Sequence, residues 1–195
     1  MRDLVPLIVF SAVSSGSPGP NNVLLWASGI QFGFRPTLRH IVGTSAGIGA
    51  MAIAVAAGVG AFIATVPEVQ VALKVGGSLY LLYLAYQIAA SNAMRRAEIA
   101  RPLGFAQAAV LQGANPKAWI FVLAAVSAFR PDDLHVALGS ALVVATMMIV
   151  VVPTAAAWAA GGTVINRFVT SDRTHRLLSI ALAIILVASV AYLWI

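Results

Sequence analysis

Residues 142–152 read Leu-Val-Val-Ala-Thr-Met-Met-Ile-Val-Val-Val, a stretch without a charged residue. A transmembrane β-strand would alternate polar and apolar residues, and this stretch does not. Apolar residues on every side of a helix are typical of a membrane span rather than of an amphipathic surface helix. The stretch therefore predicts a transmembrane α-helix.

Similar stretches lie on both sides of it, and each approaches or exceeds the roughly 20 residues that a membrane helix needs. The six apolar segments are Leu4–Gln31, His40–Val66, Val69–Ala90, Phe105–Phe129, Leu134–Thr163 and Leu177–Ile195. We expect an all-α polytopic membrane protein with six transmembrane helices, forming a single domain over residues 1–195.

Composition supports this class of protein. Of the 195 residues 61% are hydrophobic and 9% are charged, and the mean hydropathy is +0.94. Soluble domains carry about 25% charged residues, so we expect neither a soluble enzyme nor a disordered chain. The chain has no cysteine, which excludes disulfides, thiolate catalysis and Cys-ligated metals. We expect no cofactor.

The net charge of +6 would favour nucleic-acid binding in a soluble protein. In a membrane protein basic residues orient the helices, because they gather in cytoplasmic loops. Eight basic residues lie in the first, third and fifth loops and three on the opposite side. We therefore expect cytoplasmic odd loops, both termini outside, a lipid bilayer around the chain and no nucleic-acid partner.

The first segment also has features of a signal peptide, since Arg2 precedes the apolar run Leu4–Val13 and the small residues Ser14–Ser17. The apolar run resumes at Val23–Trp26, however. We expect both pieces together to form one span.

The polar connection Ser91–Leu103 divides the chain into halves of three helices, about residues 1–90 and 104–195. The first half starts outside and the second inside. Equivalent helices would then run in opposite directions, as in the inverted repeats of many transporters.

The first helix of each half is interrupted. The interruptions read Ser-Gly-Ser-Pro-Gly-Pro-Asn-Asn at residues 15–22 and Gln-Gly-Ala-Asn-Pro-Lys at residues 112–117. Proline lacks an N–H and crowds the preceding turn, so the helix must stop and restart. Asn115 before Pro116 has the pattern of an N-cap followed by Pro at the first helical position, and Ser17 or Gly19 with Pro20 can act in the same way.

Two half-helix N-termini near the membrane centre would present free N–H groups and positive dipole ends, which suit a substrate carboxylate. The alternative is a pair of plain proline kinks. Correspondence of the two breaks favours a site. The candidate substrate-binding residues are Pro18, Gly19, Pro20, Asn21, Asn22, Asn115, Pro116 and Lys117.

Lys117 strengthens this expectation. A lysine at mid-span costs about 2.5–3.5 kcal/mol on insertion scales and is functional by default. No span contains a carboxylate that could pair with it. We therefore expect an unpaired cation that can hold an anion, with snorkelling to the interface as the alternative.

Two other features are less specific. The Gly43–Gly47 segment has the GxxxG pattern, which serves close packing inside one chain or a homodimer. His40, His135 and His175 lie near the ends of spans, so we expect surface histidines rather than a metal site.

The Pro-Gly-Pro-Asn run at 18–21 and the Asn-Pro-Lys-Ala run at 115–118 resemble motifs of the LysE/RhtB family of amino-acid exporters. The segments Gly29–Arg35 and Gly77–Ala85 also match it. The resemblance implies export of amino acids or derivatives, driven by the proton-motive force, across a bacterial inner membrane. It places the family's motif on residues 18–21 and 115–117. Some exporters of basic amino acids carry acidic residues within their spans, which this chain lacks, so we expect a small neutral amino acid.

Three other interpretations remain at this point. A cation or metal exporter would need a midplane carboxylate or a His cluster, and an intramembrane enzyme a Ser–His or paired-Asp constellation. Neither pattern is present in the expected spans. A non-transporting membrane subunit would not need two broken helices.

Overall fold

The computed structural model describes residues 4–58, 65–90, 101–131, 133–168 and 171–192. Within these ranges the protein is all-helical, with eight helices and no strand. The helices are α1 (Val5–Gly16), α2 (Pro20–Phe32), α3 (Phe34–Ala56), α5 (Pro67–Ala90), α6 (Phe105–Gly113), α7 (Pro116–Phe129), α8 (Val136–Asn166) and α9 (Asp172–Tyr192). The expected all-α class is confirmed.

The predicted segments correspond to these helices, although several boundaries lie five or more residues from the predicted positions. The first and fourth segments are each divided into two helices, as expected, at residues 17–19 and 114–115. The second begins at Phe34 and not at His40, because Gly33, with φ of 84°, turns the chain directly into α3. Left-handed φ suits glycine, which has no Cβ. His40 therefore lies well inside a helix.

The described residues identify two or three of the six predicted spans. By length and composition, α3 and α8 could each cross a membrane, and α6 with α7, bent by 73° at their break, would make a third span. These counts apply to the described residues. The inverted six-helix repeat is therefore a proposal, and most of the loop at 91–103 lies outside the described residues.

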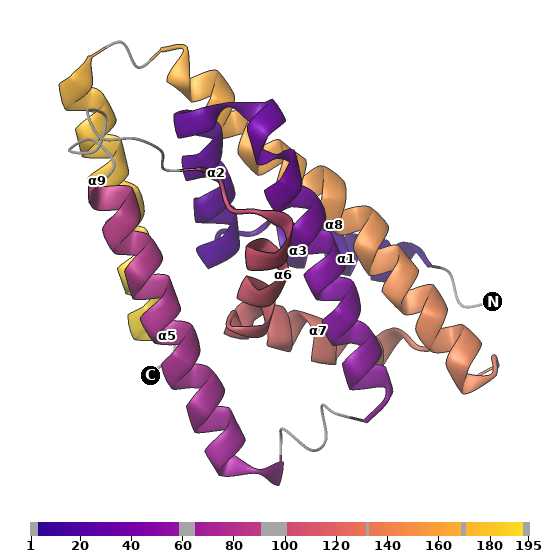
Figure 1. Cartoon of the computed structure of the whole chain (residues 1–195). Helices are drawn as coiled ribbons and strands as arrows, with labels where there is room; N and C mark the ends of the chain where they lie inside the picture. Colours follow the sequence, from indigo (N-terminus) through magenta and orange to yellow (C-terminus); the bar gives the residue numbers. More distant parts are fainter. Residues whose placement is uncertain (1–3, 59–64, 91–100, 132, 169–170, 193–195) are drawn as a thin grey trace.

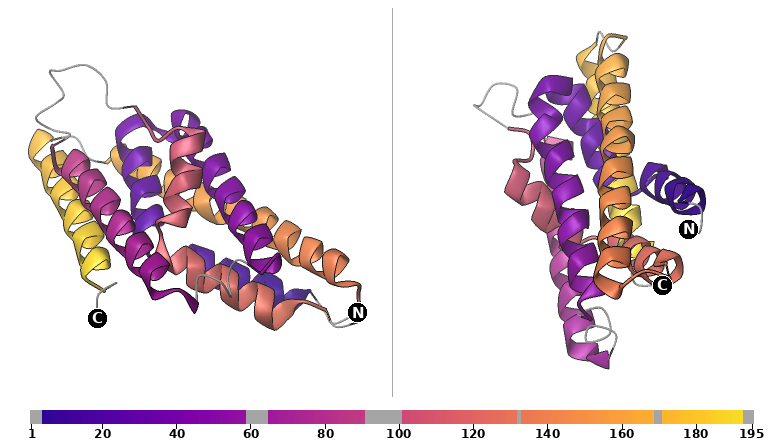
Figure 2. Two further views of the ribbon diagram at one scale, coloured as in Figure 1. Left: turned by 60° about the horizontal axis from the view of Figure 1, so that its bottom comes forward. Right: turned by 90° about the vertical axis from the view of Figure 1, so that its right-hand side faces the viewer.

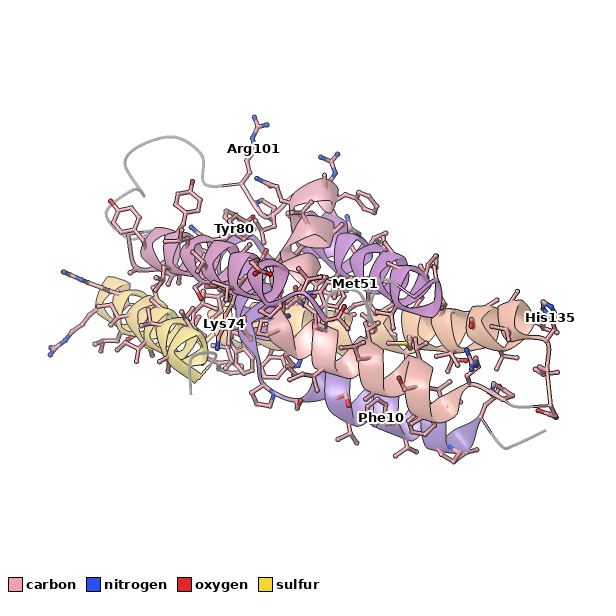
Figure 3. The ribbon with its side chains drawn as sticks, turned by 90° about the horizontal axis from the view of Figure 1, so that it is seen from below. Phe10, Met51, Lys74, Tyr80, Arg101 and His135 are labelled. Atoms are coloured by element: carbon pink, nitrogen blue, oxygen red, sulfur yellow. The ribbon has the colours of Figure 1, made fainter. Side chains whose placement is uncertain are left out.

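Figure 1 shows α5 and α9 side by side at one edge of the molecule. They pack on α2 and α6 through a shared apolar cluster that includes Leu24, Leu111 and Leu186. Among the other helices, α2 packs against α8, and α3 packs against both α6 and α8. The half-helices α1 and α7 lie side by side across the end of this group (Figure 2). Phe10 of α1 (Figure 3) joins them through ring contacts with Phe121 and Phe129, at centroid distances of 5.8 and 5.1 Å.

Close helix packing explains the GxxxG segment. A Cβ on Gly43 would lie 2.4 Å from the carbonyl oxygen of Phe105, and one on Gly47 would lie 2.6 Å from that of Ala109. Both distances are too short for any side chain, so these glycines let α3 approach α6 closely. The motif is used inside the chain.

Polar and apolar residues are distributed as expected for a membrane protein. Large apolar side chains such as Val110, Ile120 and Ile149 are about 70% exposed, at 72, 71 and 72%. Asn21, Gln112 and other polar side chains are buried. Lipid tolerates the exposed apolar groups, whereas polar groups must find partners inside the protein.

Candidate functional site

The first break lies between α1 and α2. Helix α1 ends at Gly16, Ser17 and Gly19 have extended backbones, and Pro20 occupies the first position of α2 with Gly19 as its N-cap. The restart predicted at Pro20 is confirmed. Extended residues cannot continue the helical hydrogen bonds, so the carbonyl groups at the end of α1 need other donors.

Side chains supply those donors. Asn22 Nδ2 donates to the carbonyl oxygens of Ser15 and Ser17, at 2.7 and 2.8 Å. Trp158 Nε1, from α8, donates to that of Gly16 at 3.0 Å. The C-terminal end of α1 is therefore fixed by the helix that follows it and by α8.

The second break, between α6 and α7, has the predicted order of Asn115 as N-cap and Pro116 at the first helical position. The Asn115 side chain, however, makes no capping hydrogen bond. Its Oδ1 is buried without a partner among the described residues. Trp119 Nε1 donates to the Gly113 carbonyl at 2.8 Å. An unpaired buried oxygen costs about 1–3 kcal/mol, so it calls for a functional explanation.

Lys117 joins the two breaks. Its Nζ donates to the carbonyl oxygen of Ser17 at 2.5 Å and to that of Pro18 at 3.2 Å. The hydrogen-bond partners of this cation are therefore neutral backbone carbonyls and not a carboxylate. The positive charge rests on backbone carbonyls that directly follow the C-terminal end of α1, where a helix dipole favours a cation. Since an ammonium has three N–H donors, one remains for a ligand.

A cavity lies between the breaks. It encloses about 430 Å³ between atoms, its open mouth included. Both half-helix N-termini line it, and neither has a side-chain capping bond. The lining residues of α2 and α7 and their N-caps are Gly19, Asn21, Asn22, Asn115, Lys117, Ala118 and Phe121.

The eight predicted site residues fall into two groups. Gly19, Asn21, Asn22, Asn115 and Lys117 line the cavity. The three prolines do not line it: Pro20 and Pro116 start the half-helices, and Pro18 offers its carbonyl to Lys117. The breaks thus bring the five polar or small residues together, and the prolines shape the backbone.

The structure adds a polar cluster that the sequence did not predict. Asn21 Oδ1 accepts hydrogen bonds from Gln112 Nε2 at 3.0 Å, Thr44 Oγ1 at 3.1 Å and His40 Nε2 at 3.3 Å. His40 is fully buried, so the expectation of a surface histidine was wrong. We call Asn21, His40, Thr44 and Gln112 the Asn21 cluster. It ties α2 to α3 and α6.

One signal could have located this cluster. Asn21, Thr44 and Gln112 are polar residues inside apolar segments, and such residues need partners. His40 was not recognised as an internal residue because the predicted helix began at His40, whereas α3 begins at Phe34. Among the described residues, no group of three side chains could hold a metal ion.

Comparison with known proteins decides the family. The model of the LysE type translocator family matches residues 12–195. The chain belongs to the LysE type translocator family. This family is one of transporters and is not an enzyme class. The resemblance seen in the two proline motifs is thereby confirmed.

Two similar LysE-family relatives are named cysteine/O-acetylserine efflux protein. The protein of Salmonella typhimurium (strain LT2) is 31% identical over 121 residues, and that of Escherichia coli (strain K12) is 30% identical over 121 residues. Each match covers 62% of this chain and 62% of the relative, less than two thirds of its length. No solved structure matches this chain.

Proposed function

We propose that the protein is a secondary active exporter of small neutral amino acids or their derivatives across the bacterial inner membrane. The observation that carries the proposal is the cavity between the two breaks, lined by both half-helix N-termini and by Lys117. Family membership supplies translocation, and the chemistry of the cavity supplies the substrate class.

The cavity suits both charged groups of an amino acid. The remaining N–H of Lys117 and the free amides of the first turns favour a carboxylate. The buried Asn115 Oδ1, without a partner in the described structure, can accept from the α-ammonium. The carbonyls of residues 15–18 already accept hydrogen bonds from Asn22, Trp158 and Lys117, so the unpartnered Asn115 Oδ1 is the more favourable acceptor.

The remaining lining favours a neutral side chain. Lys117 is the charged residue in it, and Ile48, Phe121 and Val151 offer apolar contact. A second substrate cation would find no carboxylate, and an uncompensated buried charge costs several kcal/mol. The relatives named for cysteine and O-acetylserine efflux agree with a small uncharged side chain.

We also propose that transport proceeds by alternating access between two inverted three-helix repeats, about residues 1–90 and 104–195, driven by protons. The packing supports the repeat: the first half-helix of each break packs on the second predicted span of the other half, α1 on α8 and α6 on α3. The six apolar segments favour six spans, and the loop charges favour both termini outside.

Competition in proteoliposomes tests the substrate class. Vesicles are loaded with equal labelled O-acetylserine and lysine, and the efflux of each is followed, with vesicles of Lys117→Ala as the control. We expect O-acetylserine to leave at least about tenfold faster, since about 1.4 kcal/mol of unpaired charge suffices for that ratio. Equal or faster lysine efflux would contradict neutral selectivity. Absence of any efflux above the control would contradict export.

A further inference from the structure

His40 lies between two cavities. Its Nε2 is bound to Asn21, which lines the cavity between the breaks. The His40 ring also lines a second cavity, of about 470 Å³ with its open mouth, together with Ser28, Gln31 and Arg101. Arg101 is exposed and points outward from the helices (Figure 3). The Asn21–His40 pair therefore separates the candidate substrate site from a path toward Arg101.

The hydrogen bonds fix which ring nitrogen carries the proton. Gln112 Nε2 donates to the carbonyl of Ala108 at 3.0 Å, so its nitrogen is correctly oriented toward Asn21 as well. The Asn21 atom that it meets must therefore be the oxygen. An oxygen only accepts, so His40 Nε2 carries a hydrogen, and in the neutral ring the lone pair lies on Nδ1.

That Nδ1 is a buried basic nitrogen without a hydrogen-bond partner in the described part of the chain. Leaving this nitrogen unpaired costs about 1–3 kcal/mol. The other ring nitrogen, Nε2, is paired with Asn21. Histidines within membrane spans serve as proton relays in pumps and transporters. A vacant lone pair beside a cavity is the feature that such a relay requires.

We propose that His40 is the proton-carrying residue of the exporter, which rests on the proposed function. A proton from a hydronium ion forms the Nδ1–H bond as an O–H bond of that ion breaks, and the reverse step returns the proton to water. The imidazole alternates between its neutral and its cationic form. No other covalent bond changes.

The described groups around His40 do not stabilise its cationic form, so that form depends on conformations in which water reaches the ring. Helices α2, α6 and α8 contain no ionisable residue, and the α5 residues in the second cavity are Leu84 and Ile88. Arg101 lines the same cavity, Lys117 of α7 lines the other one, and Arg39 of α3 is exposed. No described group around His40 is a carboxylate that could stabilise the cation.

Asn21 connects the protonation of His40 to substrate binding. A protonated ring donates a stronger, charge-assisted hydrogen bond through Nε2, and it favours conformations that admit water to Nδ1. Asn21 lies in the first turn of α2, at the substrate cavity. The protonation state of His40 therefore biases the half-helix that binds the carboxylate.

The test separates proton coupling from translocation. His40→Gln keeps an amide N–H donor for Asn21 but cannot titrate. Proteoliposomes with labelled O-acetylserine give two readouts: accumulation driven by a pH gradient, and exchange of internal for external O-acetylserine at equal pH. We expect gradient-driven accumulation to fall at least about tenfold, because the proton carrier is removed, while exchange stays near the wild-type rate. His135→Asn, at the exposed start of α8, is the matched control and should keep both.

Full gradient-driven accumulation by His40→Gln would overturn the proposal. Loss of exchange together with accumulation would also overturn it, provided that the variant unfolds thermally at the wild-type temperature. If His40→Gln is destabilised, His40→Asn serves in the same two assays. Wild-type vesicles without either activity would instead contradict the proposed export.

Discussion

The two helix breaks look alike in the sequence but differ in how their polar groups are satisfied. At the first break, side chains from α2, α7 and α8 donate to the carbonyl groups of residues 15–18. At the second, Trp119 donates to Gly113, while Asn115 Oδ1 is buried without a partner in the described structure. The first break is therefore held by hydrogen bonds from three helices, and the second leaves a buried acceptor that we propose binds the substrate.

Lys117 connects these unequal breaks, and its removal should have the largest effect. Lys117→Ala leaves the Ser17 and Pro18 carbonyls without their cationic donor. At about 1.5–3 kcal/mol for each charged hydrogen bond, we expect O-acetylserine flux per reconstituted protein to fall at least about 100-fold. Lys117→Gln should not restore it, since the charge is still missing.

Arg39→Gln, at an exposed position of α3, is the control for charge removal and should transport normally. Wild-type flux in Lys117→Gln would show that hydrogen bonding alone suffices. It would contradict the claim that transport requires the positive charge of Lys117.

A matched pair of asparagine variants tests whether Asn22 stabilises the first break and Asn115 binds the substrate. Asn22→Leu removes the donor to Ser15 and Ser17, so it should lower the free energy of unfolding by about 1–3 kcal/mol. Asn115→Leu removes an unpaired buried oxygen, so it should leave stability unchanged or raise it, yet reduce flux about tenfold or more by removing an acceptor for the ammonium. Thermal unfolding in detergent and proteoliposome flux measure the two effects. Destabilisation by Asn115→Leu with full flux would reverse the assignment.

Two tryptophans give the smallest expected effects. Trp158→Phe and Trp119→Phe each remove one N–H donor to a break carbonyl, of Gly16 and Gly113 respectively. Each should cost about 0.5–1.5 kcal/mol of stability and change flux less than Asn115→Leu does. A larger flux loss in Trp119→Phe than in Asn115→Leu would contradict this order. It would mean that transport depends more on the Trp119 hydrogen bond at the second break than on the Asn115 side chain.

Local chemistry made the breaks predictable. Pro20 and Pro116 end one helix and start the next because of their own backbone geometry, and the structure places both restarts there. The N-cap position of Asn115 was predictable for the same reason, whereas its missing capping bond depends on the orientation of the side chain.

Long-range contacts could not be predicted. Lys117 binds a carbonyl 100 residues away, and no local pattern specifies that approach. The Asn21 cluster joins three helices, and His40 was placed at a surface because the start of α3 was set too late. Six spans were inferred from apolar length, whereas the described residues identify α3, α8 and the bent pair α6 and α7 as spans by length and composition.

Substrate protection of a cysteine in the cavity tests the central claim most directly. The chain has no native cysteine, so Ser14→Cys, at a half-buried lining position, carries the sole thiol. The control is Ser127→Cys, at an exposed position of α7 that does not line the cavity. Binding of a substrate between the breaks predicts that O-acetylserine slows maleimide labelling of Cys in Ser14→Cys and leaves that in Ser127→Cys unchanged. Equal labelling of Ser14→Cys with and without O-acetylserine, in a variant that still transports it, would contradict the site.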